Sequence, residues 1–309
     1  MVKPVGATRL RKAHFGYNPA MAAKIIDGNA LAASIKEQVR ARSQQLKAEG
    51  RVVHLAALLV GNTPAAEMYA KRQAEACADV GIDYELVKLP ADARVEQANA
   101  TIDRLNQDES ISGIMVHQPL PQHIDSTALL ARISAVKDVE GVSPASLGHL
   151  LLGTPLNVPC TALAAVECIL STGVSVRGAE VVVVGASEIV GKPAALLLSD
   201  QRATVSICRS ATRDLAGHTR RAQILIAAVG KPHFIRAEHV AEGTVVIDVG
   251  INRVTLPDGS KKTLGDVEFE SVAPKASFIT PVPGGVGPLT VAMLLRNAVR
   301  SSAAGQKQH

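Results

Sequence analysis

The sequence of 309 residues predicts an α/β fold of two domains, each built on a parallel sheet. The length is sufficient for two domains with separate cores. Apolar residues make up 47% of the chain but aromatic residues only 2%, with no Trp, so Val, Leu, Ile and Ala must form the cores. That composition suits parallel sheets covered by helices. Segments with strand and helix patterns also alternate along the chain.

The first half supplies the substrate domain, which we expect to span residues 24–155. Apolar residues at helical spacing predict helices, and short apolar runs predict strands. The expected helices are 30–49, 65–79 and 95–106, and the expected strands are 54–60, 84–89 and 111–116. This alternation gives a parallel layer. A stretch rich in Gly, Pro and Ser, residues 138–160, is expected to cross between the domains.

The second half, residues 156–288, predicts a doubly wound, Rossmann-like nucleotide-binding domain. After a helix at 161–171, four consecutive valines at 181–184 predict a buried strand. Further strands are expected at 204–208, 224–229 and 245–249, each ending at a small or polar residue. We expect the C-terminal helix, residues 289–301, to pack back onto the first domain and complete it.

The net charge of +5 arises from basic residues near the N-terminus. Residues 1–24 contain five basic side chains and no acidic one, so the rest of the chain is neutral overall and a nucleic-acid-binding face has no support. We interpret residues 1–23 as a basic extension, of which 1–20 precede the patterned sequence as an upstream segment or flexible arm without a catalytic role.

The patterns of cysteine, histidine and apolar residues argue against a disulfide-bonded, metal-binding or membrane-spanning protein. The four cysteines form no C-x-x-C pair and fit a reduced, cytoplasmic protein. The nine histidines form no metal-binding pattern, so no metal is expected. No apolar run approaches the ~20 residues of a membrane span.

A loop rich in proline and glycine, residues 277–290 (SFITPVPGGVGPLT), is the most informative segment. Proline fixes the backbone, and glycine lets a ligand touch it. A rigid loop between a strand and a helix presents free N–H groups to something flat or anionic. A tight structural turn needs fewer such residues. We therefore predict a binding loop that includes Pro283, Gly284, Gly285 and Gly287.

The turn after the four valines predicts a dinucleotide site. Its spacing is G-x-S-x-x-x-G rather than G-x-G-x-x-G, so the pyrophosphate is expected to lie differently. A tight βα turn without a ligand is the alternative. The candidate cofactor-binding residues are Gly185, Ala186, Ser187, Ile189, Val190 and Gly191 in the turn, and Val229, Gly230, Ile251 and Gly287 beyond it.

The end of the next strand favours NADP. A carboxylate there would bind the ribose hydroxyl of NAD, but this chain has Arg209 and Ser210, a cation and a donor that suit a 2′-phosphate. NAD stays an alternative, as does an arginine that is merely exposed. Lys192 is a second candidate for neutralising phosphate.

Several long motifs in order resemble the methylenetetrahydrofolate dehydrogenase/methenyltetrahydrofolate cyclohydrolase family, over nearly the whole chain. They are PVPGGVGPLT, GASEIVGKP, VIDVGINR, Gly265-Asp266-Val267 and Pro159-Cys160-Thr161. The resemblance implies two Rossmann-like domains in a homodimer, with a cleft for folate and NADP. It implies oxidation of 5,10-methylenetetrahydrofolate to the methenyl cation, followed by hydrolysis to 10-formyltetrahydrofolate.

The family's substrate-pocket motifs are altered in this chain. Tyr69 matches the tyrosine that packs on the folate, but Gln73 stands where the family has its catalytic lysine. His117 replaces a glutamine, and Gln118 follows it. Glu140 replaces the aspartate that binds the pterin. The resemblance thus implies Tyr69, Gln73, His117 and Glu140 as catalytic positions, and Tyr69, Gln118, Glu140, Pro283, Gly284 and Gly285 as substrate-binding ones.

These replacements predict an NADP-dependent dehydrogenase whose cyclohydrolase activity is weak or lost. An amide cannot titrate, so Gln73 cannot move a proton as lysine can. Hydride transfer depends instead on alignment. We interpret His117 as a neutral hydrogen-bonding substitute for the family's glutamine. The alternative is that its imidazole acts as a replacement base. Other hypotheses are an enzyme for a modified pterin or another one-carbon derivative, a non-catalytic paralogue that binds nucleotide or folate, and a generic Rossmann dehydrogenase.

Overall fold

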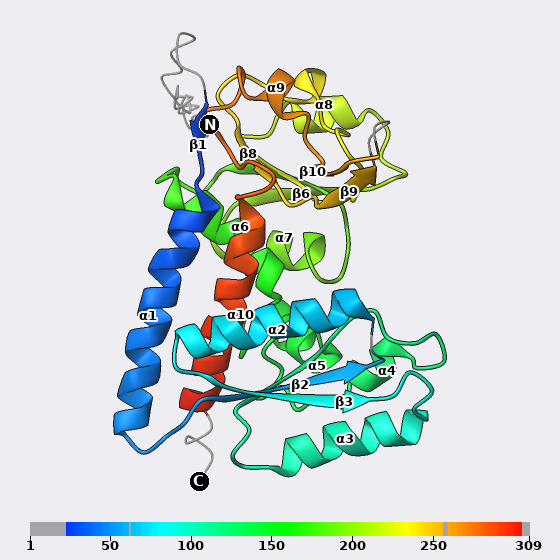
Figure 1. Ribbon diagram of the computed structural model, residues 1–309. Coiled ribbons are helices and arrows are strands. Elements are labelled where there is room, and N and C mark those ends of the chain that lie inside the picture. The colour runs from blue at the N-terminus through cyan, green and yellow to red at the C-terminus, as the bar shows by residue number, and fades with distance from the viewer. Residues whose placement is uncertain (1–22, 62, 256–258, 305–309) are drawn as a thin grey trace, which may run out of the picture.

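The computed structural model describes residues 23–61, 63–255 and 259–304, and within this range the chain forms two parallel sheets joined by long helices. Figure 1 shows the larger sheet at the top and the smaller one at the bottom. The predicted α/β class and its two domains are therefore present. The predicted extension, residues 1–23, lies outside the described residues except for its last member.

The smaller sheet has the order β3-β2-β4, all parallel. Its strands are β2 (His54–Val60), β3 (Asp83–Leu89) and β4 (Gly113–Val116). Helix α2 (Pro64–Asp79) covers one face and α3 (Val95–Gln107) the other (Figure 1). Side chains alternate between the two faces of a strand, so each face builds its own core. Two short helices follow, α4 (Ser126–Leu130) and α5 (Pro144–Leu151).

The larger sheet has the order β1-β11-β8-β7-β5-β6, again all parallel. The strands are β1 (Lys24–Ile25), β5 (Glu180–Val184), β6 (Thr204–Cys208), β7 (Ile224–Ala227), β8 (Val245–Asp248) and β11 (Phe278–Ile279). An antiparallel pair, β9 (Asn252–Thr255) with β10 (Lys261–Leu264), lies beside it. The helices are α6 (Cys160–Ser171), α7 (Gly191–Asp200), α8 (Leu215–Thr219), α9 (Phe269–Val272) and the 3₁₀ turn η1 (Ala237–His239).

Two long helices, α1 (Gly28–Ala48) and α10 (Val286–Ala304), connect the sheets. They run side by side from the larger sheet towards the smaller one (Figure 1). Their beginnings are tied together, because the Gly28 N–H donates to the Gly284 carbonyl at 2.9 Å. Further along α10, the Asn297 amide donates to the carbonyl oxygens of Val139 and Val158. Helix α10 therefore makes contacts in both domains.

Local signals explain where the helices begin. The Asp27 carboxylate caps α1 by accepting from two backbone N–H groups, and Thr63 caps α2 ahead of Pro64. Ser143 caps α5 in the same way, with Pro144 in the first turn. These are preferred residues at helix starts because they satisfy N–H groups that have no partner within the helix.

The structure departs from the predicted elements at a few places. The stretch 138–160 contains a helix, α5, because Ser143 and Pro144 form a helix start inside a segment rich in loop residues. The last helix begins at Val286 rather than 289, since Pro288 is tolerated in a first turn. Strand β7 ends at Ala227 rather than 229, and the Val229 N–H donates to the Asp266 carboxylate. Lys24 and Ile25 join the larger sheet.

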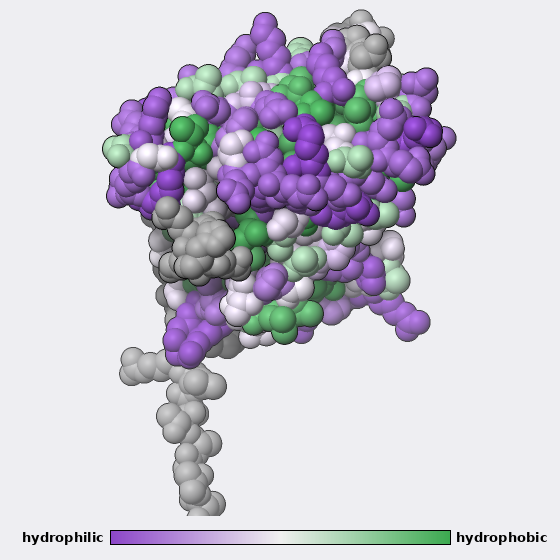
Figure 2. Space-filling view, turned by 90° about the horizontal axis from the view of Figure 1, so that it is seen from below, coloured by the Kyte–Doolittle hydropathy of each residue, from purple (hydrophilic) through white to green (hydrophobic). Residues whose placement is uncertain are grey.

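The described surface is largely polar at the end that carries α3. Figure 2 shows this end, where hydrophilic side chains cover most of the area and hydrophobic ones form small groups. No helix in the described ranges is long and apolar enough to cross a membrane. Among the same residues, no three His, Cys, Asp or Glu side chains gather in a way that could hold a metal ion. All four cysteines are free and buried.

Candidate active site

Most predicted cofactor-binding residues lie at one edge of the larger sheet. The turn 185–191 follows β5, Arg209 follows β6, Val229 follows β7 and Ile251 follows β8. The loop 281–285 follows β11. All these strands are parallel, so the segments share the carboxyl edge. Ligands of open α/β sheets bind at this edge, where the strand order reverses, which here is between β5 and β7.

The turn after β5 needs both of its glycines. Gly185 has φ +122°, a conformation that side chains disfavour. A Cβ at Gly191 would collide with the Gly185 carbonyl. The Ser187 hydroxyl accepts a hydrogen bond from the Val190 N–H at 3.2 Å, and Ile189 is exposed beside it. The turn, in which Ala186 lies between Gly185 and Ser187, therefore presents backbone atoms to a ligand at the start of α7.

The cation and the hydroxyl at the end of β6 are both exposed. Arg209 and Ser210 follow Cys208, and no carboxylate stands at these two positions. The backbone N–H of Arg209 donates to the Thr212 hydroxyl at 2.8 Å, while the guanidinium extends from a fixed backbone. This donor set suits a phosphate better than a ribose hydroxyl. The ammonium of Lys192, the other candidate, is paired with Glu188 at 2.7 Å.

The Asp266 carboxylate fixes the loop after β7. Its Oδ2 accepts from the N–H groups of Val229 at 2.6 Å and Gly230 at 2.9 Å, and its Oδ1 accepts from Lys231 at 2.9 Å. The amide of Asn252 donates to the same Oδ1 at 2.8 Å. Asp266 is fully buried. Two predicted cofactor residues, Val229 and Gly230, are thus positioned by a side chain that sequence reasoning did not select.

Asp248 makes a similar set of contacts one strand away. Its Oδ1 accepts from the N–H groups of Gly250 and Asp266, both at 2.9 Å, and its Oδ2 accepts from Val267 at 2.9 Å. Burial raises the pKa of Asp248 to about 7, against the lowering by these hydrogen bonds, and the neighbouring Asp266 charge adds to the rise. The contacts hold the segment that contains Ile251 close to residues 265–267.

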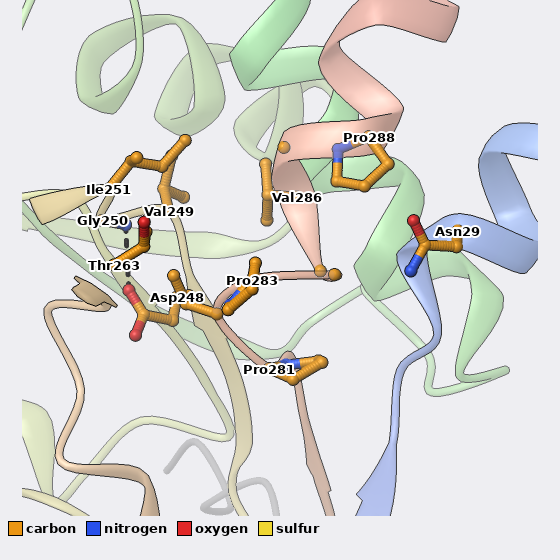
Figure 3. Close-up of a pocket in the computed structure, with 14 residues that line it drawn as sticks. Asn29, Asp248, Val249, Gly250, Ile251, Thr263, Pro281, Pro283, Val286 and Pro288 are labelled. Carbon is orange, nitrogen blue, oxygen red and sulfur yellow. Dashed lines mark hydrogen bonds between the residues drawn. The ribbon is translucent and has the colours of Figure 1, made fainter. Parts of the chain in front are cut away.

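The proline- and glycine-rich loop lines a pocket of about 340 Å³. Pro283, Gly284, Gly285 and Gly287 line it together with Ile251, so the structure brings these predicted residues into one site. Figure 3 shows the loop between Asp248–Ile251 on one side and Asn29 of α1 on the other. A Cβ at Gly28 would collide with the carbonyl of Gly285. The start of α1 therefore packs backbone against backbone on this loop.

Tyr69, His117 and Glu140, three of the four predicted catalytic residues, gather at the end of β4 in the smaller sheet, and Gln73 lies on the same helix as Tyr69. Tyr69 and Gln73 lie one turn apart on α2, His117 follows β4, and Glu140 follows a short bridge between Ile114 and Asp138. The rings of Tyr69 and His117 are perpendicular, with centroids 5.8 Å apart. Tyr69 is 52% exposed and His117 only 5%. Tyr69 thus offers a surface ring that rests on a buried imidazole.

Glu140 lies beside this pair in a largely buried position. Its Oε2 accepts from the Val116 N–H at 3.3 Å. Burial raises the pKa of Glu140 to about 7, and the Asp138 charge adds to the rise while the hydrogen bond opposes it. The pKa of Tyr69 is raised by burial and then by the Glu140 charge. The carboxyl group can therefore hold or release a proton near neutral pH.

Gln73 and Gln118 differ in environment. Gln73 is 3% exposed, and its Nε2 makes no hydrogen bond of ordinary geometry with a described residue, although its side chain lies beside Cys77 and lowers the pKa of that thiol against the larger rise from burial. Such an orphaned buried donor is rare and costs free energy. Gln118 is exposed, and its amide donates to the Ser126 hydroxyl at 2.9 Å. Of the two, only Gln73 keeps an unused donor inside the fold.

These features define a two-domain α/β protein with a Rossmann-like sheet, a pocket at the carboxyl edge of that sheet and a cluster of candidate residues around Tyr69. Residues 26–140 match the catalytic domain of the tetrahydrofolate dehydrogenase/cyclohydrolase family, and residues 159–306 match the NAD(P)-binding domain of that family. The bifunctional protein FolD of Moorella thermoacetica is 49% identical over 282 residues, covering 91% of this chain and 99% of that relative.

Solved structures agree with the sequence matches. The crystal structure of a FolD methylenetetrahydrofolate dehydrogenase/cyclohydrolase from Campylobacter jejuni has a TM-score of 0.87 at 43% identity, covering 91% of this chain and 99% of that one. The Trypanosoma brucei FolD complexed with NADP and an inhibitor has a TM-score of 0.85 at 37% identity, covering 92% and 98%. The chain belongs to the tetrahydrofolate dehydrogenase/cyclohydrolase family, as the resemblance predicted. It is an NAD(P)-binding enzyme of one-carbon metabolism that acts on a tetrahydrofolate derivative.

Sequence reasoning missed several residues of the site. Asn29, Asp248 and Thr263 line the pocket, and Asp266 positions the loop after β7. Asp248 and Asp266 stand in segments quoted for the resemblance, where an acid two residues before Gly250 and another directly after Gly265 were an available signal. No sequence signal points to Tyr84, whose hydroxyl lies 3.2 Å from His117 Nε2.

Proposed function

We propose that this enzyme oxidises 5,10-methylenetetrahydrofolate with NADP and hydrolyses the methenyl product weakly or not at all. The observation that carries the proposal is Gln73. It occupies the position of the family's catalytic lysine, four residues after Tyr69, and is buried with an unpaired Nε2. Relatives such as the Moorella protein carry the name bifunctional. The proposal therefore distinguishes this chain from them by its weak or absent hydrolysis activity.

The two activities make different demands on the protein. Hydrolysis requires a water to be activated and a proton to be moved, and general acid–base assistance contributes ~10²–10⁴-fold. The Gln73 amide cannot change its protonation. His117 is buried, which lowers its pKa, and Glu140 already accepts the Val116 N–H. Glu140 titrates near neutral pH, but in this proposal its carboxyl group binds the N–H edge of the pterin and so does not activate water in place of the lysine.

Oxidation depends on alignment, which the chain retains. NADP, when bound, accepts the hydride. The protein's contribution is to hold the folate against Tyr69 and the cofactor against the loop 281–288, and alignment at near-attack distance provides much of such rate enhancements. In this proposal the turn 185–191 holds the phosphates, and Arg209 and Ser210 hold the 2′-phosphate. The pocket beside Ile251 and Pro283 receives the flat end of the cofactor.

The test follows both activities in the purified full-length protein. With methylenetetrahydrofolate and NADP, we expect reduced cofactor to form and methenyltetrahydrofolate to accumulate, both by absorbance. Gln73→Lys should raise hydrolysis of added methenyltetrahydrofolate at least tenfold, whereas Gln73→Met, of similar length without charge, should not. Hydrolysis by the unaltered protein at a rate matching its oxidation rate would contradict the proposal.

Other outcomes point to the other hypotheses. The side chain of Glu140 is one methylene longer than the family aspartate, and misplacement by ~1 Å can cost ~10²-fold in rate. A poor reaction with methylenetetrahydrofolate but a good one with a modified pterin would favour that substrate. Tight nucleotide binding with no reduction would favour a non-catalytic paralogue.

We propose further that the enzyme works as a homodimer in the cytoplasm. The dimer is supported by the family membership, and the compartment by four free, buried cysteines. Analytical ultracentrifugation of the full-length protein should give a species of twice the mass of the 309-residue chain. A single monomeric species at micromolar concentration would contradict the dimer.

A further inference from the structure

Tyr84 and His117 meet on the face of the smaller sheet that α2 covers. In the sheet register Tyr84 of β3 lies opposite Leu55 of β2, which in turn lies opposite Gly113 of β4. Side chains of alternate residues share a face, so Tyr84, Leu55, Met115 and His117 point to the same side. The Tyr84 hydroxyl reaches across β2 and lies 3.2 Å from His117 Nε2.

His117 is held from three directions. Its backbone N–H donates to the Leu58 carbonyl at 2.9 Å, which fixes the chain after β4. The perpendicular Tyr69 ring lies against one side of the imidazole, and the Tyr84 hydroxyl meets Nε2. Nδ1 makes no hydrogen bond with any residue of the described ranges. One nitrogen is therefore engaged by the fold, and the other stays available to a ligand.

Both partners are neutral near pH 7, so their contact is a hydrogen bond between two uncharged groups. Burial lowers the pKa of His117. Burial also raises the pKa of Tyr84 well above its usual value, with smaller contributions from Cys77 and Tyr69. A neutral imidazole has one N–H and one acceptor nitrogen, so Nε2 either accepts the phenol proton or donates its own proton to the phenol oxygen. When the Tyr84 O–H is the donor to Nε2, the imidazole proton lies on Nδ1.

We propose that Tyr84 is a positioning residue for the substrate site: its hydroxyl holds His117 in the Nδ1–H tautomer, and the Nδ1–H donates a hydrogen bond to the folate that packs on Tyr69. This inference rests on the proposed function, because it takes the ring of Tyr69 as the folate platform. It assigns to β3 a part in substrate recognition, through a residue that does not itself touch the substrate.

The tautomer can be measured without substrate or turnover. In full-length protein labelled with ¹⁵N in histidine, the ring of His117 should show a protonated Nδ1 and an unprotonated Nε2, identified by comparison with His117→Gln. Tyr84→Phe removes only the hydroxyl and should shift His117 towards the Nε2–H tautomer. The matched control is Ser112→Ala, which removes a hydroxyl from the same sheet where it bonds to His54 and Val52, and should leave His117 unchanged.

A double-mutant cycle tests the link to substrate. Tyr84→Phe should raise KM for methylenetetrahydrofolate about 3- to 10-fold with little change in kcat, the effect of one lost hydrogen bond. His117→Gln replaces the ring by an amide donor that needs no tautomer, so adding Tyr84→Phe to it should change KM less than about twofold. A lost fold would instead lower the active fraction of enzyme in both backgrounds.

Three results would overturn the inference. They are a wild-type His117 protonated mainly at Nε2, a tautomer that does not respond to Tyr84→Phe, and equal KM effects of Tyr84→Phe in both backgrounds. If the unaltered protein forms no reduced NADP from folate, the proposed function fails, and the NMR result still decides whether Tyr84 sets the tautomer.

Discussion

The backbone N–H of Asp266 donates to the Asp248 carboxylate at 2.9 Å, so the side chain of one buried acid positions the backbone of the other. Asp248 holds the start of residues 265–267, and Asp266 in turn holds the loop after β7. A Cβ at Gly250 would collide with the Asp266 carboxylate, and one at Gly265 would collide with that of Asp248. Glycine at these two positions is therefore the consequence of packing two carboxyl groups against the backbone.

Asp266→Asn should weaken NADP binding more than folate binding. An amide offers one acceptor oxygen and points its NH₂ at backbone donors, so at least one of Val229, Gly230 and Lys231 loses its partner. An unsatisfied buried donor costs roughly 1–3 kcal/mol, which predicts about a tenfold rise in the Kd of NADP if the loop contacts the cofactor. Titration calorimetry measures this. A lower melting temperature with unchanged NADP affinity would show that the network supports only the fold.

Gly28→Ala should disrupt the pocket at the proline- and glycine-rich loop. The added Cβ would collide with the carbonyl groups of Gly285 and Gly284, which are backbone atoms that cannot turn away. Gly148→Ala is the matched control, because that helical glycine has nothing within 4 Å of an added Cβ, and the change should be neutral or stabilising by roughly 0.4–1 kcal/mol. Thermal melts and KM for both substrates compare the two. Equal behaviour would mean that the loop yields without cost.

Arg209→Ala should lower the preference for NADP over NAD. Loss of a charge-assisted hydrogen bond to phosphate costs roughly 1.5–3 kcal/mol, or about 10- to 100-fold in kcat/KM for NADP, and leaves NAD nearly unchanged. Arg177→Ala is the control, since this exposed arginine precedes β5 and lies at the opposite edge of the sheet. If both variants keep the NADP preference of the unaltered protein, the 2′-phosphate is held elsewhere.

Glu140 should make the protein less stable as pH rises from about 4.5 to 7. The carboxyl group has a pKa of about 7 in the fold against an ordinary value of about 4.5 in the unfolded chain, so the native state binds more protons than the unfolded state over this range. Stability then falls with increasing pH, by on the order of 3 kcal/mol in all, and levels off above pH 7. Glu140→Gln should make this part of the profile less steep in urea unfolding series, and the remaining slope includes Asp248, whose pKa burial also raises to about 7. A profile of unchanged slope would show that Glu140 titrates at its ordinary pKa.

The sequence determined the local elements and the ancestry of this chain. Four valines at 181–184 predicted a buried strand, and 54–60 predicted another, since continuous apolar runs between helical patterns carry that information locally. The loop 281–288 and the replacement at Gln73 were visible for the same reason: each is a short segment whose residue types limit its chemistry.

Only the tertiary structure decided which distant residues meet. Tyr84 and His117 are 33 residues apart, and their contact depends on both sharing one face of a sheet whose middle strand is β2. Asp266 reaches Gly230 across 36 residues because its N–H is held by Asp248, at the end of the strand β8 that pairs with β7. Strand order and register are set by packing summed over the whole sheet, so no local pattern specifies these pairs.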